Sequence, residues 1–513
     1  MLILVTCLLL FATAAALLIL RALQPNARYT WLVASGGAAF ALISVFFWLA
    51  QMPSSLNLPV WQPLSLFPTP IAFTIDGISW ALTISICSLT LAVLLTSVTR
   101  SVITNSLSWA GILALGGIGI LAVTANNPLT LLLVWAFIDL IELISQLSSV
   151  NGEKQSEQIV ISFSTRAFGI ALLLWSYIES SMSGNSFSFQ TMSANTGAYL
   201  VIAAGLRLGV LPLHLPYSAG SFLRRGFGTS LRLIGAAASL SILMRVTISP
   251  SGLTPYLMIL TTIAALYGGW MWLRAPDELN ARPYWMIGIA SLAILSALSG
   301  NPVGAAAWGC VLIFAGGALF LSSVQNLRLN RALLIGVWSL SALPFSLTGS
   351  AWMGSFNFIT PFALIAQALM MAGFIRHALR STASETLDDQ PGWAKIVYPA
   401  GIIVLLAAQI LLGFIGWEGA FESGSWIQAM IASLLTLGLV WGFRRFRIFN
   451  PVRAHWVSAA GAGVNSIYQW LWSLYRGLAR LSQTITESLE GEGGIMWTLL
   501  FLALFILVIT RGN

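Results

Sequence analysis

Residues Pro128 to Ser149, with the sequence PLTLLLVWAFIDLIELISQLSS, form an apolar stretch long enough to cross a membrane as one helix. Two acidic residues, Asp139 and Glu142, lie near its middle. Because they are three positions apart, both side chains project from the same face of that helix. A carboxylate at this depth costs roughly 2.5–3.5 kcal/mol on insertion scales, so it normally faces protein, an opposite charge or water. The stretch therefore predicts a membrane helix whose charged face is buried.

The expected partner of these acids lies in a second apolar stretch, Tyr199 to Tyr217 (YLVIAAGLRLGVLPLHLPY). Arg207 stands near the middle of this stretch, and two prolines flank His214 and interrupt the helix. We therefore expect Asp139, Glu142, Arg207 and His214 to form the polar centre of the molecule.

Composition places the whole chain in the membrane class. Of its 513 residues, 58% are hydrophobic and only 8% are charged, and the mean hydropathy is +0.87. Its cysteines, Cys7, Cys87 and Cys310, lie in apolar spans without the spacing of metal ligands, so we expect no disulfide framework, no metal site and no cofactor. The glycines from Gly116 to Gly119 fall within a membrane helix, where they favour close helix packing rather than nucleotide binding.

The hydropathy pattern predicts an all-α polytopic membrane protein with about sixteen transmembrane helices. The expected spans are 2–22, 29–50, 74–98, 107–124, 128–149, 158–178, 197–216, 229–247, 255–273, 284–299, 302–323, 332–348, 356–376, 396–416, 426–443 and 495–511. The first span has neither a basic region before it nor a cleavage site after it, so we expect it to be retained as a helix.

Positive charge collects in every second predicted loop, which indicates that these loops are cytoplasmic. The residues concerned are Arg21, Arg28, Arg100, Lys154, Arg224, Arg225, Arg274, Arg282, Arg328, Arg331, Arg376, Arg380, Lys395, Arg444, Arg445, Arg447 and Arg453. The pattern predicts a multi-pass protein of the cell (inner) membrane with its amino terminus outside. The formal net charge of +8 then suits anionic lipids on the cytoplasmic side and calls for no nucleic-acid partner.

Two proline-containing motifs suggest an internal duplication. Val210 to Pro216 (VLPLHLP) has a counterpart in Ala342 to Thr348 (ALPFSLT). We expect two inverted five-helix repeats, each with a broken helix, because an odd number of helices reverses the orientation of the second repeat. The predicted parts are 1–106 (helices one to three), 107–250 and 251–380 (the two repeats), 381–448 (helices fourteen and fifteen), 449–494 (a surface helix with a glycine-rich turn) and 495–513 (the last helix).

The predicted surface helix is amphipathic and lies on the cytoplasmic side. Between Ile467 and Ile485, apolar residues recur at spacings of four and three, with charged residues on the other faces. Two interpretations stay open: a helix that floats at the membrane interface, or a strap that packs on a partner subunit.

Several motifs, in this order, resemble the antiporter-like membrane subunits of respiratory complex I, membrane-bound hydrogenases and multisubunit cation/proton antiporters. The motifs are Phe73 to Ser79 (FTIDGIS), Phe137 to Leu140 (FIDL), Arg207 five residues before Pro212, Asp277 to Tyr284 (DELNARPY) and Ser341 to Pro344 (SALP). The motif Phe137 to Leu140 is similar to the family's Phe-Trp-Glu-Leu motif, which aligns the family's acid with Asp139. In an alternative alignment that counts from Asn127, the family's acid falls on Ala136.

The resemblance implies a path of protonatable residues, from which this sequence departs. In the family a glutamate and lysine pair begins the path, whereas here the pair is Asp139 and Arg207, and arginine does not release its proton in proteins. Arg232 stands near the expected relay position, but Gly316 and Met353 stand where the family has titratable groups. We therefore expect a degenerate proton path.

The candidates for an ion or proton path are Asp139, Glu142, Arg207, His214 and Arg232, and the expected structural charges within the membrane are Asp76 and Arg166. A static ion pair between Asp139 and Arg207 is the competing interpretation. We identify no catalytic residue.

Three functions remain open. The first is a membrane subunit of a redox-driven, ion-translocating complex similar to NADH–quinone oxidoreductase or hydrogenase. The second is a subunit of a cation/proton antiporter or ion-coupled carrier. The third is a structural scaffold that has lost transport. In the first case it is a non-catalytic subunit whose partners are other membrane subunits.

Overall fold

The computed structural model describes most of the first 446 residues. The described residues are 2–24, 30–59, 70–99, 106–147, 153–182, 189, 194–217, 225–246, 251–324, 326–353, 357–379, 386–417, 424, 426–446 and 473. Contacts divide the chain into two units, Met1–Gly442 and Phe443–Asn513, and the helical bundle belongs to the first. The predicted surface helix and the predicted span 495–511 lie outside the described residues.

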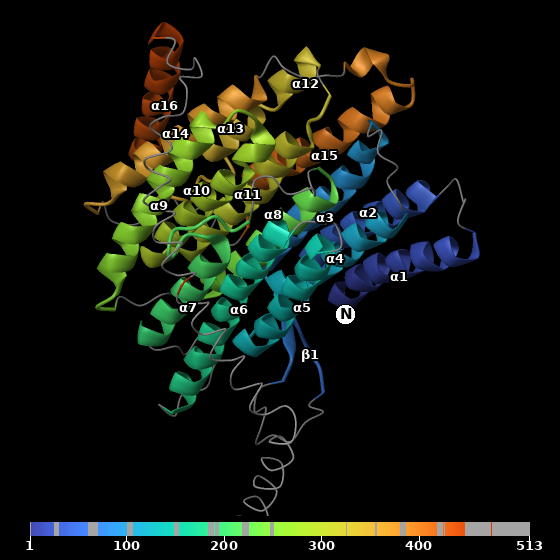
Figure 1. Ribbon diagram of the computed structural model, residues 1–513, viewed down its shortest axis with the longest axis horizontal. Helices are drawn as coiled ribbons and strands as arrows, with labels where there is room; N and C mark the ends of the chain where they lie inside the picture. Colours follow the sequence, from blue (N-terminus) through green and yellow to red (C-terminus); the bar gives the residue numbers. More distant parts are fainter. Residues whose placement is uncertain are drawn as a thin grey trace, which may run out of the picture. The chain divides into compact units, whose positions relative to one another are not determined.

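The bundle consists of long helices that run in similar directions, with a few short ones between them (Figure 1). The α-helices are α1 (Leu2–Leu23), α2 (Thr30–Phe46), α3 (Gly77–Thr96), α4 (Ser106–Thr124), α5 (Pro128–Leu147), α6 (Glu153–Met182), α7 (Ala194–Leu208), α8 (Phe227–Arg245), α9 (Thr254–Arg274), α10 (Glu278–Leu298), α11 (Pro302–Leu321), α12 (Leu327–Ala332), α13 (Ile335–Leu340), α14 (Thr360–Ala378), α15 (Ala394–Ile415) and α16 (Trp426–Phe446). The 3₁₀ helices are η1 (Phe47–Gln51), η2 (Ser97–Thr99) and η3 (Leu387–Asp389).

The polytopic helical fold predicted from hydropathy is confirmed, but the number of sixteen spans is not. Among the described residues, 12 helices are long and apolar enough to cross a membrane, and two apolar helices, Thr196–Leu208 and Trp426–Gly442, are shorter. The predicted span 332–348 is instead divided: α12 and α13 are separate six-residue helices, and the chain after Leu340 is not helical.

The broken helices are also confirmed, and each break has a local cause. The first follows α7 and is described with the site. After α13, Ala342 and Phe345 have positive φ values of 57° and 61°, which non-glycine residues rarely adopt. Thr348 holds this turn, because its Oγ1 accepts a hydrogen bond from the Ala342 N–H (3.0 Å) and donates one to the Ser339 carbonyl (2.6 Å). The inverted relationship between the two repeats stays a prediction.

A short two-stranded ribbon differs from the all-helical expectation. Strand β1 (Ser54–Asn57) pairs antiparallel with β2 (Ala72–Ile75), in a register that places Ser54 opposite Ile75. Helix α3 therefore begins at Gly77 and not at residue 74 as predicted. The physical reason is a capping box: the Asp76 carboxylate accepts a hydrogen bond from the Ser79 N–H (2.7 Å), while the Asp76 N–H donates to Ser79 Oγ (2.8 Å).

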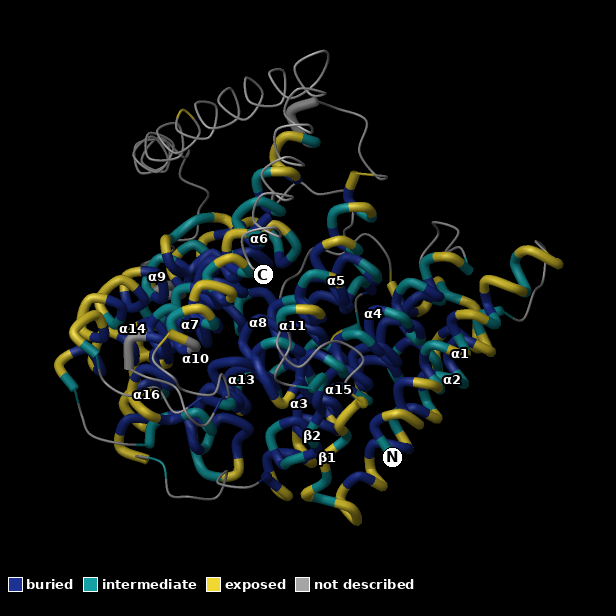
Figure 2. Tube along the Cα trace, turned by 90° about the horizontal axis from the view of Figure 1, so that it is seen from below, coloured by how far each residue is buried: buried dark blue, intermediate teal, exposed yellow. Residues whose placement is uncertain are grey.

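Helices α3, α8, α10 and α11 form the buried centre of the bundle, as Figure 2 shows by their dark blue tubes. They contact one another: α11 packs against α3, α8 and α10. Helices α1, α2, α9 and α16 expose large apolar side chains, for example Leu8, Phe40, Ile263 and Leu437. Such apolar surface suits lipid or neighbouring membrane proteins.

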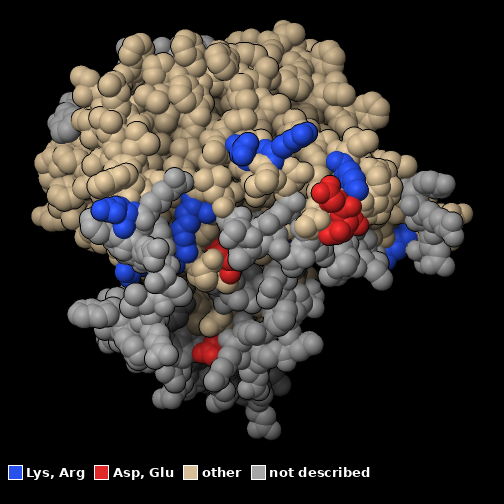
Figure 3. All heavy atoms as spheres, turned by 90° about the horizontal axis from the view of Figure 1, so that it is seen from above, with Lys and Arg blue, Asp and Glu red and all other residues tan. Residues whose placement is uncertain are grey.

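Charged side chains are sparse on one face of the described part of the chain. Figure 3 shows a face on which wide areas carry neither acidic nor basic residues, while the charges gather in a few small places. A surface of this kind suits contact with hydrocarbon, because a charged group there would lose its hydration.

Candidate functional site

Helix α5 turns its two acids toward the protein and its apolar residues outward. Asp139 and Glu142 are only 1% and 2% exposed, whereas Phe137 and Ile144 are 62% and 65% exposed. This division follows the helical period, because positions three or four apart lie on one face. Helices α6 and α8 pack against α5 and so cover the acids.

Helix α7 stops one residue after Arg207 because Gly209 adopts a positive φ of 74°. The Val210 N–H donates to the Gly205 carbonyl (2.8 Å), and the Gly209 N–H donates to the Leu206 carbonyl (3.3 Å). These two bonds form a Schellman motif, the usual glycine-dependent end of a helix. Arg207 is thereby placed in the last turn, where the helix dipole favours a positive charge.

Arg207 holds Asp139 with both of its terminal nitrogens. Nη1 lies 2.6 Å from Asp139 Oδ2, and Nη2 lies 2.9 Å from Oδ1. Arg207 Nε donates to Ser239 Oγ on α8 (3.1 Å), and the guanidinium carbon lies 4.3 Å from the ring centre of Trp135. The contact is therefore a bidentate, charge-assisted pair with a cation–π contact on one side.

Glu142 is held by two further arginines. Arg166 on α6 donates to its Oε2, and Arg232 on α8 donates to its Oε1, which also accepts a hydrogen bond from Gln146 Nε2 (2.6 Å). Arg166 Nε also lies 3.7 Å from Asp139 Oδ1, so it connects the two carboxylates. We call these five residues, Asp139, Glu142, Arg166, Arg207 and Arg232, the arginine–carboxylate cluster.

The charged groups continue from this cluster along α8 and α10. The Arg232 guanidinium lies 3.9 Å from the ring centre of Tyr217, and Arg282 lies 5.9 Å from the same ring. Beyond them, Arg225 Nη2 forms an ion pair with Glu278 Oε1 (2.6 Å). The result is a row of polar groups that leads from the middle of the bundle to the amino-terminal ends of α8 and α10.

Two predicted residues contact none of the five cluster residues: His214, which was expected in the polar centre, and Asp76, which was expected as a structural charge. His214 is in the non-helical segment after α7, with Nδ1 2.8 Å from the Pro212 carbonyl oxygen, and it forms no ion pair. Asp76 caps α3, and its carboxylate accepts a hydrogen bond from Arg245 Nη1 (3.0 Å) on α8. Asp76 therefore lies at the end of a membrane helix and contacts none of the five cluster residues.

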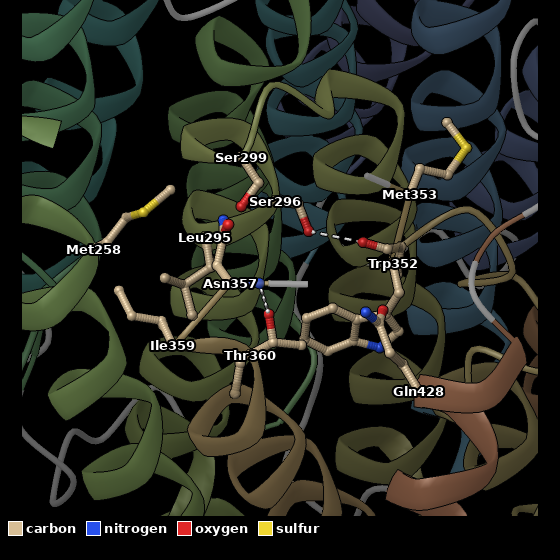
Figure 4. A pocket seen from close by; sticks show the side chains of 12 residues that line it. Met258, Leu295, Ser296, Ser299, Trp352, Met353, Asn357, Ile359, Thr360 and Gln428 are labelled. Atoms are coloured by element: carbon tan, nitrogen blue, oxygen red, sulfur yellow. Dashed lines mark hydrogen bonds between the residues drawn. The ribbon is translucent and has the colours of Figure 1, made fainter. Parts of the chain in front are cut away.

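Around Met353, in the second predicted repeat, the described side chains that face the interior are uncharged. A small cavity, with about 40 Å³ open to the centres of water molecules, is lined by polar and apolar side chains including Ser296, Ser299, Met353, Thr360 and Gln428. Figure 4 shows the serine hydroxyls and Gln428 around this space, with no acidic or basic side chain among the residues drawn. None of the described residues that line this cavity has a titratable side chain.

The packing around Gly316 leaves no room for a larger residue at this position. A Cβ atom at this position would lie 2.5 Å from Nε1 of Trp285, which packs against the glycine from α10. The place where the resemblance expected a lysine is therefore filled by an indole ring.

Sequence reasoning missed Tyr217, Arg282 and the ion pair of Arg225 with Glu278 as parts of the polar row. Arg225 and Arg282 were counted as loop charges because they flank predicted spans. The signal that could have found Arg282 is its position within the first turns of a helix that is otherwise apolar. Among the described residues, no group of three or more His, Cys, Asp or Glu side chains could hold a metal ion.

The fold and the cluster together define a class: a polytopic helical membrane protein with broken helices and buried ion pairs at its centre. Comparison with solved structures identifies the fold more closely. It is the fold of membrane subunits in complexes of the Mrp and complex I type, and the antiporter-like resemblance expected from the sequence is confirmed at the level of the fold.

Three solved structures illustrate the similarity. A chain of the Mrp complex from Dietzia sp. DQ12-45-1b superposes with a TM-score of 0.70 at 14% identity, over 100% of this chain and 63% of that one. A chain of the membrane-bound sulfane sulfur reductase, an archaeal respiratory membrane complex, gives 0.64 at 13% identity over 99% of both chains. A chain of respiratory complex I from Thermus thermophilus, determined with bound aureothin, gives 0.59 at 19% identity over 80% of this chain and 98% of that one.

No protein-family model matches the sequence, and no curated protein sequence is significantly similar to it. This chain spans 63% of the length of the Dietzia chain.

Proposed function

We propose that this chain is an antiporter-like membrane subunit of a redox-driven, ion-translocating complex that resembles the membrane arm of NADH–quinone oxidoreductase, with a degenerate proton path. Electron transfer belongs to other chains of that complex. This chain contributes helices to the membrane arm and supplies no catalytic residue.

The arginine–carboxylate cluster is the observation that carries this proposal. Both oxygens of Asp139 are held by Arg207, and both oxygens of Glu142 are held by Arg166 and Arg232. A proton that arrived at either carboxylate would break charge-assisted hydrogen bonds and leave a buried guanidinium without its partner. Since arginine itself does not release a proton, the cluster favours a static core over a working relay.

Two positions in the second predicted repeat, Gly316 and Met353, support the same conclusion. The cavity near Met353 contains no titratable side chain, and Trp285 occupies the space next to Gly316. A proton path needs donors and acceptors that titrate in sequence along the membrane, and this half offers none at those two positions.

The basic residues and the exposed apolar side chains indicate how the chain lies in the membrane. Basic residues lie in the last turn of several helices, for example Arg21 in α1, Arg274 in α9 and Arg376 in α14. This pattern supports an amino terminus outside the cell membrane, cytoplasmic basic loops and anionic lipid there. The exposed apolar side chains of α1, α2, α9 and α16 suit neighbouring membrane subunits.

A cation/proton antiporter subunit is the second candidate. It is favoured by the similarity to the Dietzia Mrp complex, whose TM-score of 0.70 exceeds those of the two respiratory complexes. The third candidate, a scaffold without transport, is favoured by the carboxylates of Asp139 and Glu142, whose oxygens are all held by guanidinium groups.

The test is to purify the full chain from its native membranes in mild detergent and to identify the chains that accompany it by mass spectrometry. The first candidate requires several membrane subunits together with at least one chain that carries redox centres, which a reduced-minus-oxidised spectrum of the same sample would detect. Membrane subunits without any redox centre would favour the antiporter candidate. A chain that purifies alone would overturn membership of a complex.

A further inference from the structure

The arginine–carboxylate cluster carries more positive than negative charge. Three guanidinium groups stand against two carboxylates, a net charge of +1. Every member is at most 8% exposed, so bulk water does not compensate the excess. A buried charge without a partner is strongly unfavourable, and arginine cannot avoid the cost by losing its proton.

The excess positive charge coincides with unused hydrogen-bond donors. The Nε and Nη2 atoms of both Arg166 and Arg232 are buried and have no hydrogen-bond partner among the described residues. Arg232 also stacks over the Tyr217 ring, but a cation–π contact engages the face of the guanidinium and leaves its in-plane N–H groups free. Arg207 differs, because its Nε, Nη1 and Nη2 atoms all donate hydrogen bonds.

A small cavity lies among these groups. Its charged lining consists of Asp139, Glu142, Arg166, Arg207 and Arg232, of which Arg166 and Arg232 have unused donors. Apolar walls come from Ile138, Leu231 and Met286. The space open to the centres of water molecules is about 20 Å³. Since one water-sized sphere needs roughly 10–15 Å³ by this measure, the cavity holds one small particle.

We propose that this cavity is a binding site for one monovalent anion of chloride size, held between Arg166 and Arg232. An anion accepts hydrogen bonds from the unused N–H groups and brings the cluster to neutrality, whereas a water molecule would satisfy the donors but leave the charge. The two carboxylates do not exclude the anion, because each is already engaged by guanidinium groups. Carboxylic acids and phosphates are too large for a cavity of this volume.

Electrostatics from the neighbouring helix favours the same ligand. Arg282 on α10 is 2% exposed and adds a further positive charge 5.9 Å from the ring centre of Tyr217. The next charged residues, Arg225 and Glu278, form their own ion pair and so add no net charge. A cation would meet a positive potential throughout this region.

The test measures chloride binding to the full-length chain in detergent. The protein is prepared in sodium gluconate, whose anion is too large for the cavity, and radiolabelled chloride is added at constant ionic strength. We expect saturable binding of one chloride per chain, competition by bromide and no competition by gluconate. In parallel, replacing gluconate by chloride should raise Tm by about 1–3 °C at tenfold the dissociation constant, because the anion binds only the folded state.

Two variants separate the site from general salt effects. Arg232→Gln removes the excess charge and two unused donors, so it should abolish both the binding and the Tm difference between chloride and gluconate. Arg166→Gln gives the same readout should the first variant fail to fold. The matched control is Arg328→Gln, an exposed arginine on α12, which should keep full chloride binding. Absence of saturable binding to the wild-type chain, or equal binding to a folded Arg232→Gln or Arg166→Gln variant, would overturn the proposal.

Discussion

Arg207 and Asp139 lie 68 residues apart in the sequence and meet through two hydrogen bonds of 2.6 and 2.9 Å in the interior of the bundle. The arginine is placed by the glycine-dependent end of α7, and the aspartate by the inward face of α5. Each residue therefore compensates a charge that the other helix could not bury alone.

A double-mutant cycle on this pair tests the mutual compensation. Asp139→Ala or Arg207→Ala alone leaves a buried charge without its partner and should lower the free energy of unfolding by about 3–5 kcal/mol, whereas the double variant should lose less than the sum. Unfolding by sodium dodecyl sulfate in mixed micelles provides the measurement. Strictly additive losses would mean that the two side chains do not interact, and would favour the register that places the family's acid at Ala136.

Removing the charge of Glu142 should destabilise the protein more than removing the side-chain amide of Gln146, its hydrogen-bond partner on the same helix. Glu142→Gln removes the anion shared by Arg166 and Arg232 and should cost about 3–5 kcal/mol of unfolding free energy. Gln146→Leu is the matched control, because it removes the 2.6 Å hydrogen bond to Glu142 but no charge, and about 1.5–3 kcal/mol is expected. Equal losses in the two variants would contradict a role for charge balance.

The end of α7 should depend on the glycine at position 209. Gly209→Ala forces an alanine into a positive φ, and its Cβ would lie 2.3 Å from the His214 carbonyl oxygen. Backbone strain alone costs about 1–3 kcal/mol, so Tm should fall clearly. The control is Gly235→Ala in the middle of α8, where the nearest atom to the new Cβ is 3.9 Å away, and there stability should stay the same or rise. A fall in the control as large as that of Gly209→Ala would argue against this explanation.

If the chain belongs to a proton-pumping complex, the second half should not carry the protons. Met353→Leu conserves volume at the uncharged cavity and should leave proton pumping by membrane vesicles unchanged, as followed by quenching of a pH-sensitive dye. Gly316→Ala is expected to reduce the amount of folded protein instead, because its Cβ would lie 2.5 Å from Trp285 Nε1. Lost pumping in a fully assembled Met353→Leu complex would refute the prediction.

The tail after Phe446 lies almost entirely outside the described residues, and the prediction for it comes from the sequence alone. If the amphipathic segment is a strap, truncation after Phe446 should leave the preceding helices inserted but weaken retention of a partner subunit during purification. Charged substitutions at Leu474 and Leu478 should have the same effect, more mildly. Truncated protein that keeps every partner would identify the segment as an interfacial float.

The helices themselves follow from local properties of the sequence. Long apolar runs with few charges predict membrane helices because a helix satisfies its own backbone hydrogen bonds in lipid. The prolines in Tyr199 to Tyr217 predicted a break in that stretch, but α7 ends earlier than the predicted span 197–216, at Leu208, because Gly209 adopts a positive φ. The ribbon of β1 and β2 was not predicted. Its second strand, Ala72–Ile75, directly precedes the apolar run of α3, and hydropathy alone does not separate such a strand from the start of the helix.

That Asp139 and Glu142 share one face of a membrane helix follows from their spacing, because helical spacing is a property of neighbouring residues. Their arginine partners could not be identified before the helices were packed together. Glu142 is held by Arg166 and Arg232, which lie 24 and 90 positions away on two other helices, and the cavity between these arginines exists only when the helices pack together. The physical reason is that an ion pair needs atoms within about 4 Å, and helix packing, not sequence spacing, sets that distance.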